Sequence, residues 1–206
     1  MLRRGFSEGA DRDILDVIKR MAITAEYREP QIKNHLERIR GYCFILARGM
    51  ELSSQEVEII ANASILHDIG KVGLPERVAF KTDKLGAYEI ELSKQHTVIG
   101  AEIMRGSTSV YLRAGEYVAL THHERWDGSG YPRGMTKEDI PLSGRIVAIA
   151  DVFDALTTRR SYKNEIPIED AMRLIRDAGG QLFDPKVVAV FLDNFDEIGH
   201  IRQNYT

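Results

Sequence analysis

The sequence lacks both paired cysteines and long apolar segments, so neither disulfide bonds nor a membrane can stabilise its fold. It contains one cysteine, Cys43, among 206 residues, so an intramolecular disulfide is excluded. No apolar run approaches the roughly 20 residues that a membrane span requires, and no apolar signal core follows the basic start Met1–Arg4. We therefore expect a cytoplasmic protein that has no membrane partner.

An excess of positive charge is missing as well. The 28 Lys and Arg residues are balanced by 31 Asp and Glu residues, which gives a formal net charge of -3. Proteins that coat nucleic acid usually carry a basic surface, so we expect no nucleic acid polymer as a partner. A chain of this length buries roughly 70% of its unfolded surface. We expect one compact domain, with residues 1–30 forming an N-terminal helix and lead-in to residues 31–206.

Apolar residues recur at helical spacing along nearly the whole chain. A capping box at Ser53–Glu56 begins one helix, which is predicted to continue inward to His67 and Asp68, about 100° apart. Residues 145–149 also fit a strand, but length and the spacing of two aspartates favour a helix. The pattern predicts helices near residues 14–25, 31–50, 53–68, 92–103, 114–122, 145–156, 167–178 and 184–195. Residues 73–86 and 123–143 are predicted to be loops.

Five of the six histidines fall in or beside inward-facing helical positions: His35, His67, His96, His122 and His123. One histidine on an apolar face is most often a core residue. Several buried imidazoles and carboxylates without partners would cost much free energy, whereas a shared metal ion satisfies them together. A carboxylate has two oxygens, so Asp68 can bridge two ions, with Asp151 completing the set.

Six motifs follow one another along the chain. They are His67-Asp68-Ile69-Gly70-Lys71, His96–Gly100, His122–Pro132, Ile149–Thr157, Arg160–Lys163 and Phe183–Pro185. Together they resemble the HD-GYP family over about residues 35–195. The resemblance implies an all-α fold, an HD-domain helical bundle with a long GYP-containing loop, over residues 31–206. It also implies hydrolysis of cyclic di-GMP to linear pGpG, and in some members to GMP, by a metal-bridging hydroxide that attacks phosphorus.

The resemblance also implies the metal ligands. His35, His67, Asp68 and Asp151 match the ligands of one ion, and Asp68, His96, His122 and His123 match those of a second. The expected cofactors are two divalent transition metal ions, Fe or Mn, with Ni or Zn as alternatives. Family members with three metals carry a glutamate four residues before the first histidine. That position is Gln31 here, so we predict a binuclear site.

Other matched residues are expected to contact the substrate or to support the ligands. Lys71, Arg160 and Lys163 match residues that hold phosphate groups, and we expect Asp68 and Lys71 to be catalytic. Tyr131 either packs within its turn or lines the substrate groove, where relatives contact GGDEF domains. Asp154 and Glu124 are expected to lie behind the ligands, where they orient a histidine or cap a backbone group. Ser161 replaces the usual proline between Arg160 and the tyrosine.

The leading hypothesis is therefore a metal-dependent phosphodiesterase that acts on cyclic di-GMP. One alternative keeps this chemistry but uses 3′,3′-cyclic GMP-AMP. Another is a non-catalytic module that binds a cyclic dinucleotide or a GGDEF partner, which the retained ligand set argues against. Hydrolysis of a different phosphate ester ranks last, because such relatives do not need the GYP element. A homodimer is one open alternative for the oligomeric state.

Overall fold

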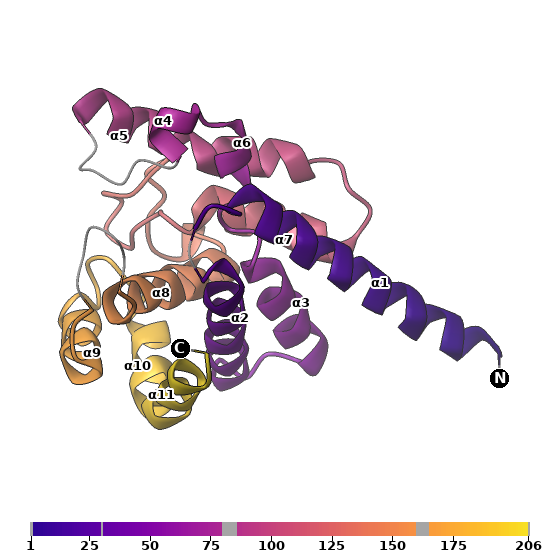
Figure 1. The fold of residues 1–206 in the computed structure, drawn as a ribbon. Helices are drawn as coiled ribbons and strands as arrows, with labels where there is room; N and C mark the ends of the chain where they lie inside the picture. Colours follow the sequence, from indigo (N-terminus) through magenta and orange to yellow (C-terminus); the bar gives the residue numbers. More distant parts are fainter. Residues whose placement is uncertain (1, 30, 80–85, 160–164, 206) are drawn as a thin grey trace.

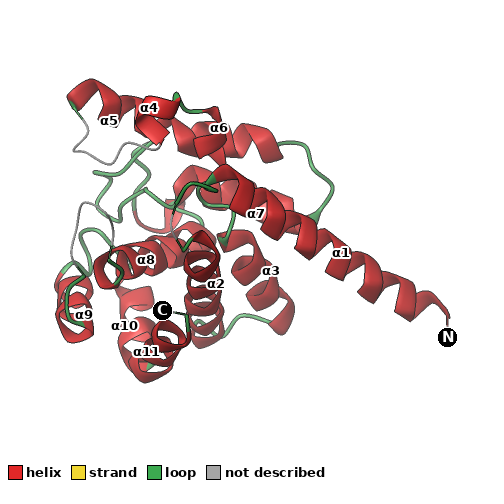
Figure 2. Ribbon diagram, in the orientation of Figure 1, coloured by secondary structure: helices red, strands yellow, loops and turns green. Residues whose placement is uncertain are grey.

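The computed structural model describes residues 2–29, 31–79, 86–159 and 165–205, and every regular element in these ranges is a helix (Figures 1 and 2). The all-α prediction is confirmed, and residues 145–149 lie in a helix rather than a strand. None of the described helices has the length and apolar composition of a membrane span. The elements are α1 (Leu2–Ala25), α2 (Ile32–Gly49), α3 (Ser54–Ser64), the 3₁₀ helix η1 (Ile69–Gly73), α4 (Glu76–Ala79), α5 (Ala87–Ser93), α6 (Gln95–Met104), α7 (Val110–Thr121), the 3₁₀ helix η2 (Lys137–Asp139), α8 (Leu142–Thr157), α9 (Ile168–Asp177), α10 (Pro185–Asp193) and α11 (Phe195–Asn204).

Helices α2 and α8 form the centre of the bundle, with α9, α10 and α11 on one side and α4, α5 and α6 on the other (Figure 1). The larger apolar core joins α2, α8 and α10 through residues such as Ile39, Phe153 and Phe191. A second core packs the C-terminal half of α1 against α2, η1 and α7, and includes Ile18 and Ile69. The N-terminal half of α1 projects away from the body.

The segment that carries His67 and Asp68 differs from its prediction. Helix α3 ends at Ser64, and both residues lie in the turn that joins it to η1. The predicted placement on one regular helix is therefore wrong. Close packing explains the change of helix type: a β carbon at Gly70 would collide with the His96 carbonyl group. Glycine lets η1 lie directly against α6 and brings the turn next to His96.

Other boundaries also differ from the helical pattern. The predicted 92–103 helix is divided between α5 and α6. The predicted 184–195 helix ends earlier, at Asp193, because the backbone of Asn194 (φ −111°, ψ 20°) leaves the helical conformation before α11 begins at Phe195. Helix α1 begins well before residue 14. The predicted loop over residues 73–86 contains α4.

Candidate metal centre

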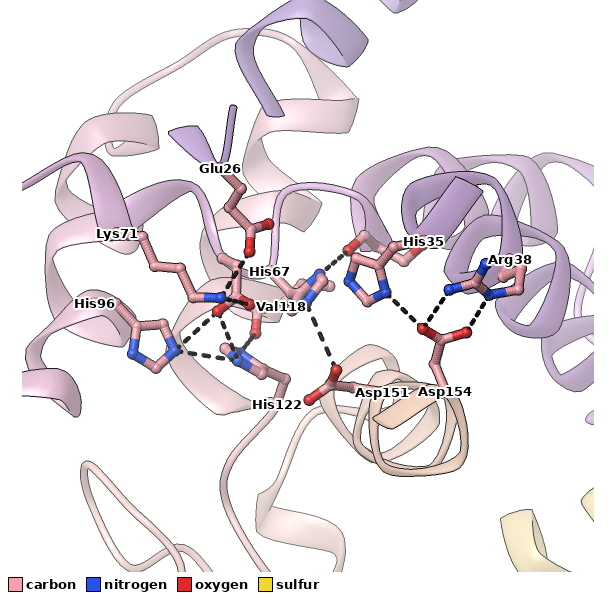
Figure 3. A network of polar contacts seen from close by, with 12 residues as sticks. Glu26, His35, Arg38, His67, Lys71, His96, Val118, His122, Asp151 and Asp154 are labelled. Atoms are coloured by element: carbon pink, nitrogen blue, oxygen red, sulfur yellow. Dashed lines mark hydrogen bonds and ion pairs between the residues drawn. The ribbon is translucent and has the colours of Figure 1, made fainter. Parts of the chain in front are cut away.

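The predicted ligands converge between α2, the α3–η1 turn, α6, the end of α7 and α8 (Figure 3). Their ligand atoms form two groups, and within each group the atoms lie within 4.8 Å of one another. One group is Asp68, His96, His122 and His123, and the other is His35, His67 and Asp151. Residues that are far apart in the sequence are therefore brought together in the two predicted sets.

Asp68 lies between the two groups. Its Oδ1 is 3.2 Å from Nε2 of His96, and its Oδ2 is 3.2 Å from Nε2 of His67. On the far side, His67 Nε2 lies 3.9 Å from Oδ1 of Asp151. The two oxygens of Asp68 thus face different groups, which is the geometry that a bridging carboxylate requires.

The histidines are oriented by hydrogen bonds on their Nδ1 atoms. A carbonyl or carboxylate oxygen only accepts, so the Nδ1 atom beside it carries the proton and the Nε2 atom keeps its lone pair for a ligand. The acceptors are Ser64 O at 3.0 Å for His67, Ser93 O at 2.6 Å for His96, Val118 O at 3.0 Å for His122 and Asp154 Oδ2 at 2.8 Å for His35.

Two observations show that these residues fit a metal ion. Nε2 of His67 is one of the buried side-chain atoms in the described chain that have no hydrogen-bond partner. Nε2 of His96 and Nε2 of His122 lie 3.4 Å apart, so two lone pairs face each other beside Asp68. A cation between these nitrogens and the carboxylates resolves both features. Nitrogen-rich sites with bridging carboxylates suit transition metals such as Fe, Mn, Ni or Zn.

The charges at the site are strongly coupled. Burial opposes protonation of His67, but the Asp68 carboxylate outweighs it and raises the pKa of His67 to about 9. Burial, together with the neighbouring His67 and His96, lowers the pKa of His122 to about 3. Burial also opposes ionisation of Asp68, yet Lys71 and His67 lower its pKa well below the ordinary value. At neutral pH His67 therefore carries a second proton on Nε2, and a metal ion that binds this nitrogen must displace that proton.

Asp154 lies directly behind His35, as expected for a supporting residue. Its carboxylate also accepts hydrogen bonds from Arg38, with Nε to Oδ1 at 2.5 Å and Nη2 to Oδ2 at 3.0 Å. Burial opposes its ionisation, but His35 and Arg38 lower the pKa of Asp154 to about 2. Sequence reasoning missed Arg38. A detectable signal exists, because Arg38 follows His35 at the same spacing that separates Asp154 from Asp151.

Lys71 contacts the centre through Asp68, whose Oδ2 lies 2.7 Å from Lys71 Nζ. The same ammonium lies 2.6 Å from Oε2 of Glu26, a buried residue that directly follows α1 and that sequence reasoning also missed. Gln31, in the position of the third-metal glutamate, is the exposed N-cap of α2 with φ 64°. It does not join either group of candidate ligands.

The loop after His123 folds back against the centre. The Tyr131 ring stacks on the His123 ring, with centroids 4.8 Å apart, and Lys94 Nζ lies 5.4 Å from the Tyr131 centroid. Glu124 is buried, and its carboxylate accepts hydrogen bonds from the backbone N–H groups of Arg133 at 2.7 Å and Met135 at 3.0 Å. Glu124 therefore fixes the shape of the loop.

A largely apolar cavity of about 330 Å³ opens beside His122 and His123. Helices α8 and α9 and the turn after α9 supply most of its lining, including Val152, Leu174 and Phe183. Arg125 contributes a positive charge to the wall. The predicted phosphate contacts Arg160 and Lys163, and Ser161 between them, lie outside the described residues.

Comparison with known proteins identifies a family and several relatives. A family model described as "HD domain" matches residues 19–187. A cyclic di-GMP phosphodiesterase of Thermotoga maritima is 45% identical over 90% of this chain and 50% of its own length. A 3′3′-cGAMP-specific phosphodiesterase 2 of Vibrio cholerae is 40% identical over 91% of this chain and 36% of its own length. The chain thus spans half or less of the length of these relatives.

A solved structure of Bdellovibrio bacteriovorus, described as a HDG"Y"P protein, superposes with a TM-score of 0.63. The alignment covers 80% of this chain and 52% of that protein at 18% identity, so it shows a shared fold. The family match covers most of the chain and includes all seven candidate ligands. The chain belongs to the HD domain family.

Proposed function

We propose that this protein is a metal-dependent phosphodiesterase that hydrolyses cyclic di-GMP to linear pGpG, with GMP as a further product. One observation carries the proposal: six side chains with metal-ligand chemistry meet on either side of Asp68, which is itself the seventh candidate ligand. The names of the relatives support the substrate class, since the Thermotoga maritima protein is a cyclic di-GMP phosphodiesterase.

Two divalent transition metal ions fit the donor set. His35, His67 and Asp151 would hold one ion and His96, His122 and His123 the other, and Asp68 would offer an oxygen to each. When bound, such ions neutralise phosphate charge and activate water. The protein's own residues then orient the phosphate. Lys71 Nζ, 2.7 Å from Asp68 Oδ2, is placed to donate a charge-assisted hydrogen bond to a phosphate oxygen beside the centre.

The cavity beside His122 and His123 supports a nucleotide substrate. Its volume of about 330 Å³ and its apolar walls suit a purine base, and Arg125 can donate to the base edge or stack on it. The Tyr131 ring stacks on the His123 ring and would border the sugar-phosphate part of the substrate. Phosphate contacts from Arg160 and Lys163 stay predictions.

A second candidate is the same chemistry on 3′,3′-cyclic GMP-AMP, which the Vibrio cholerae relative favours. Both candidates are tested by incubating each cyclic dinucleotide with anaerobically purified protein reloaded with Fe(II) or Mn(II), followed by chromatography. We expect pGpG or GMP from cyclic di-GMP with the parent protein and none with Asp68→Ala. Faster cleavage of cyclic GMP-AMP would favour the second candidate. No product from either, at two metal ions per chain, would leave a non-catalytic binding module.

Four further expectations stay predictions. They are the binuclear rather than trinuclear centre, the contact of the Tyr131 turn with a GGDEF domain, a homodimer, and the cytoplasmic location.

A further inference from the structure

The Lys71 ammonium is held by a carboxylate that lies outside both groups of candidate ligands. Glu26 directly follows α1, and its Oε2 lies 2.6 Å from Lys71 Nζ. The Glu26 side chain is 7% exposed, whereas the Lys71 side chain keeps 29% exposure. Figure 3 shows the Glu26 carboxylate pointing towards the same ammonium that contacts Asp68. The carboxylate is thus buried and paired, while the ammonium stays within reach of a substrate.

A buried carboxylate is costly unless a cation compensates it, so this contact needs an explanation. Lys71 already has Asp68 as a partner at 2.7 Å. Both oxygens of Asp68, however, face candidate metal ligands. Glu26 is therefore the carboxylate that serves Lys71 without also facing the candidate ligands. An ammonium has three N–H donors, so two carboxylates leave one donor for a phosphate oxygen.

Helix α1 fixes the position of the Glu26 carboxylate. Ile18, Ala22 and Ala25 on α1 are buried in the same apolar cluster as Leu66 and Ile69, which flank the His67–Asp68 turn. Packing thus places Glu26 at a defined distance from the turn. A lysine side chain has four flexible carbon–carbon bonds, and a carboxylate on a packed element restricts where its ammonium lies. Burial opposes the charged form, but Asp68 and Glu26 raise the pKa of Lys71 further above its ordinary value.

We propose that Glu26 is a positioning residue that holds the Lys71 ammonium in place for a substrate phosphate. The inference rests on the proposed function, in which Lys71 contacts that phosphate. Glu26 acts through Lys71 and does not touch the substrate itself.

The first test is a double-mutant cycle on catalysis with Glu26→Gln, Lys71→Met and the double variant, each reloaded with metal and checked for metal content. Glu26→Gln is expected to lower kcat/KM about tenfold, the effect of one charge-assisted hydrogen bond. In the Lys71→Met background it is expected to have no further effect, because its role passes through Lys71. The control is Glu29→Gln, an exposed carboxylate three residues further on, which should stay within about twofold of the parent. If the losses in kcat/KM caused by Glu26→Gln and Lys71→Met are additive in the double variant, the proposal is wrong.

The second test uses the same four proteins without metal and does not depend on activity. Urea unfolding gives an equilibrium constant for each. Glu26→Gln should favour unfolding about tenfold in the parent protein, because it weakens a buried ion pair. In the Lys71→Met background the same change should favour folding, because it removes an unpaired buried carboxylate. If Lys71→Met does not fold, Lys71→Gln replaces it in both cycles.

The two tests separate the possible failures. If Glu26→Gln changes the unfolding constant equally in both backgrounds, Glu26 does not hold Lys71 and the proposal is wrong. If the unfolding effect reverses but the parent hydrolyses no cyclic dinucleotide, the Glu26–Lys71 contact is established and the proposed function is what fails.

Discussion

The contact of Arg38 with Asp154 gives the sharpest stability prediction. Both side chains are at most 2% exposed, and Asp154 accepts hydrogen bonds from Arg38 and from His35. The pKa of Asp154, about 2 against an ordinary 3.8, corresponds to about 2 kcal/mol in favour of the ionised form. Asp154→Asn also leaves Arg38 buried without a counter-charge, which typically costs about 3 to 5 kcal/mol. We expect a loss of about 3 to 5 kcal/mol in the free energy of unfolding.

The assay is urea unfolding followed by circular dichroism at pH 7 with a chelator present, so that metal binding does not contribute. The control is Asp170→Asn, because Asp170 pairs with Arg173 at the surface of α9 and its side chain is 42% exposed. Exposed pairs of this kind contribute about 0 to 1 kcal/mol. A loss below about 1 kcal/mol in Asp154→Asn would show that the Arg38–Asp154 pair does not stabilise the bundle.

The Arg38–Asp154 pair also makes the free energy of unfolding depend on pH in the acid range. The folded-state pKa of Asp154 lies below its unfolded value, so its stabilisation is present above about pH 4 and is lost as the pH falls towards 2. Over this pH interval, the free energy of unfolding of the parent protein should therefore fall by about 2 kcal/mol more than that of Asp154→Asn. Equal losses in the two proteins would contradict the assignment.

Three other predictions follow from the site. Gly70→Ala should destabilise the protein by about 1 to 3 kcal/mol and reduce its metal content, because a β carbon there collides with the His96 carbonyl. The control is Gly86→Ala, where the added β carbon would lie no closer than 3.6 Å to another atom, so stability and metal content should both be kept. Because His67 has a pKa of about 9, loading Mn(II) at pH 7 should release about one proton per chain from this residue, measured in weakly buffered solution; no release would contradict its protonated state. Val152→Trp, at an exposed position lining the cavity, should raise KM for cyclic di-GMP about tenfold with little change in kcat, and an unchanged KM would place the base elsewhere.

Helical periodicity predicted most of the elements, and the resemblance of the motifs to the HD-GYP family predicted which residues meet at the centre. Both kinds of inference depend on local patterns that a single sequence displays. The turn at His67 and Asp68 was not predictable in this way. Its shape depends on Gly70 lying against the His96 carbonyl, a contact between segments that periodicity treats as independent. The sequence pattern continued a helix where close packing between two elements required a turn.

Arg38 and Glu26 were missed for a related reason. Each is a common charged residue on a helix or at its end, where a solvent-exposed position is the usual expectation. Their burial becomes evident only when α2 packs on α8 and when α1 packs on η1. Neither belongs to the candidate ligands, but each compensates a charged group that contacts one of them. Arg38 balances the carboxylate behind His35, and Glu26 balances the ammonium beside Asp68.

Two ion pairs within the chain compensate the buried carboxylates at the centre and behind it. Asp68 is paired with Lys71, and Asp154 is paired with Arg38, so both carboxylates have cationic partners from the chain. A metal ion then changes the balance mainly at His67, which must lose its proton. The arrangement predicts that metal removal leaves the bundle folded and reversibly reloadable. A metal-free protein that unfolds at neutral pH would show that these ion pairs do not compensate the centre.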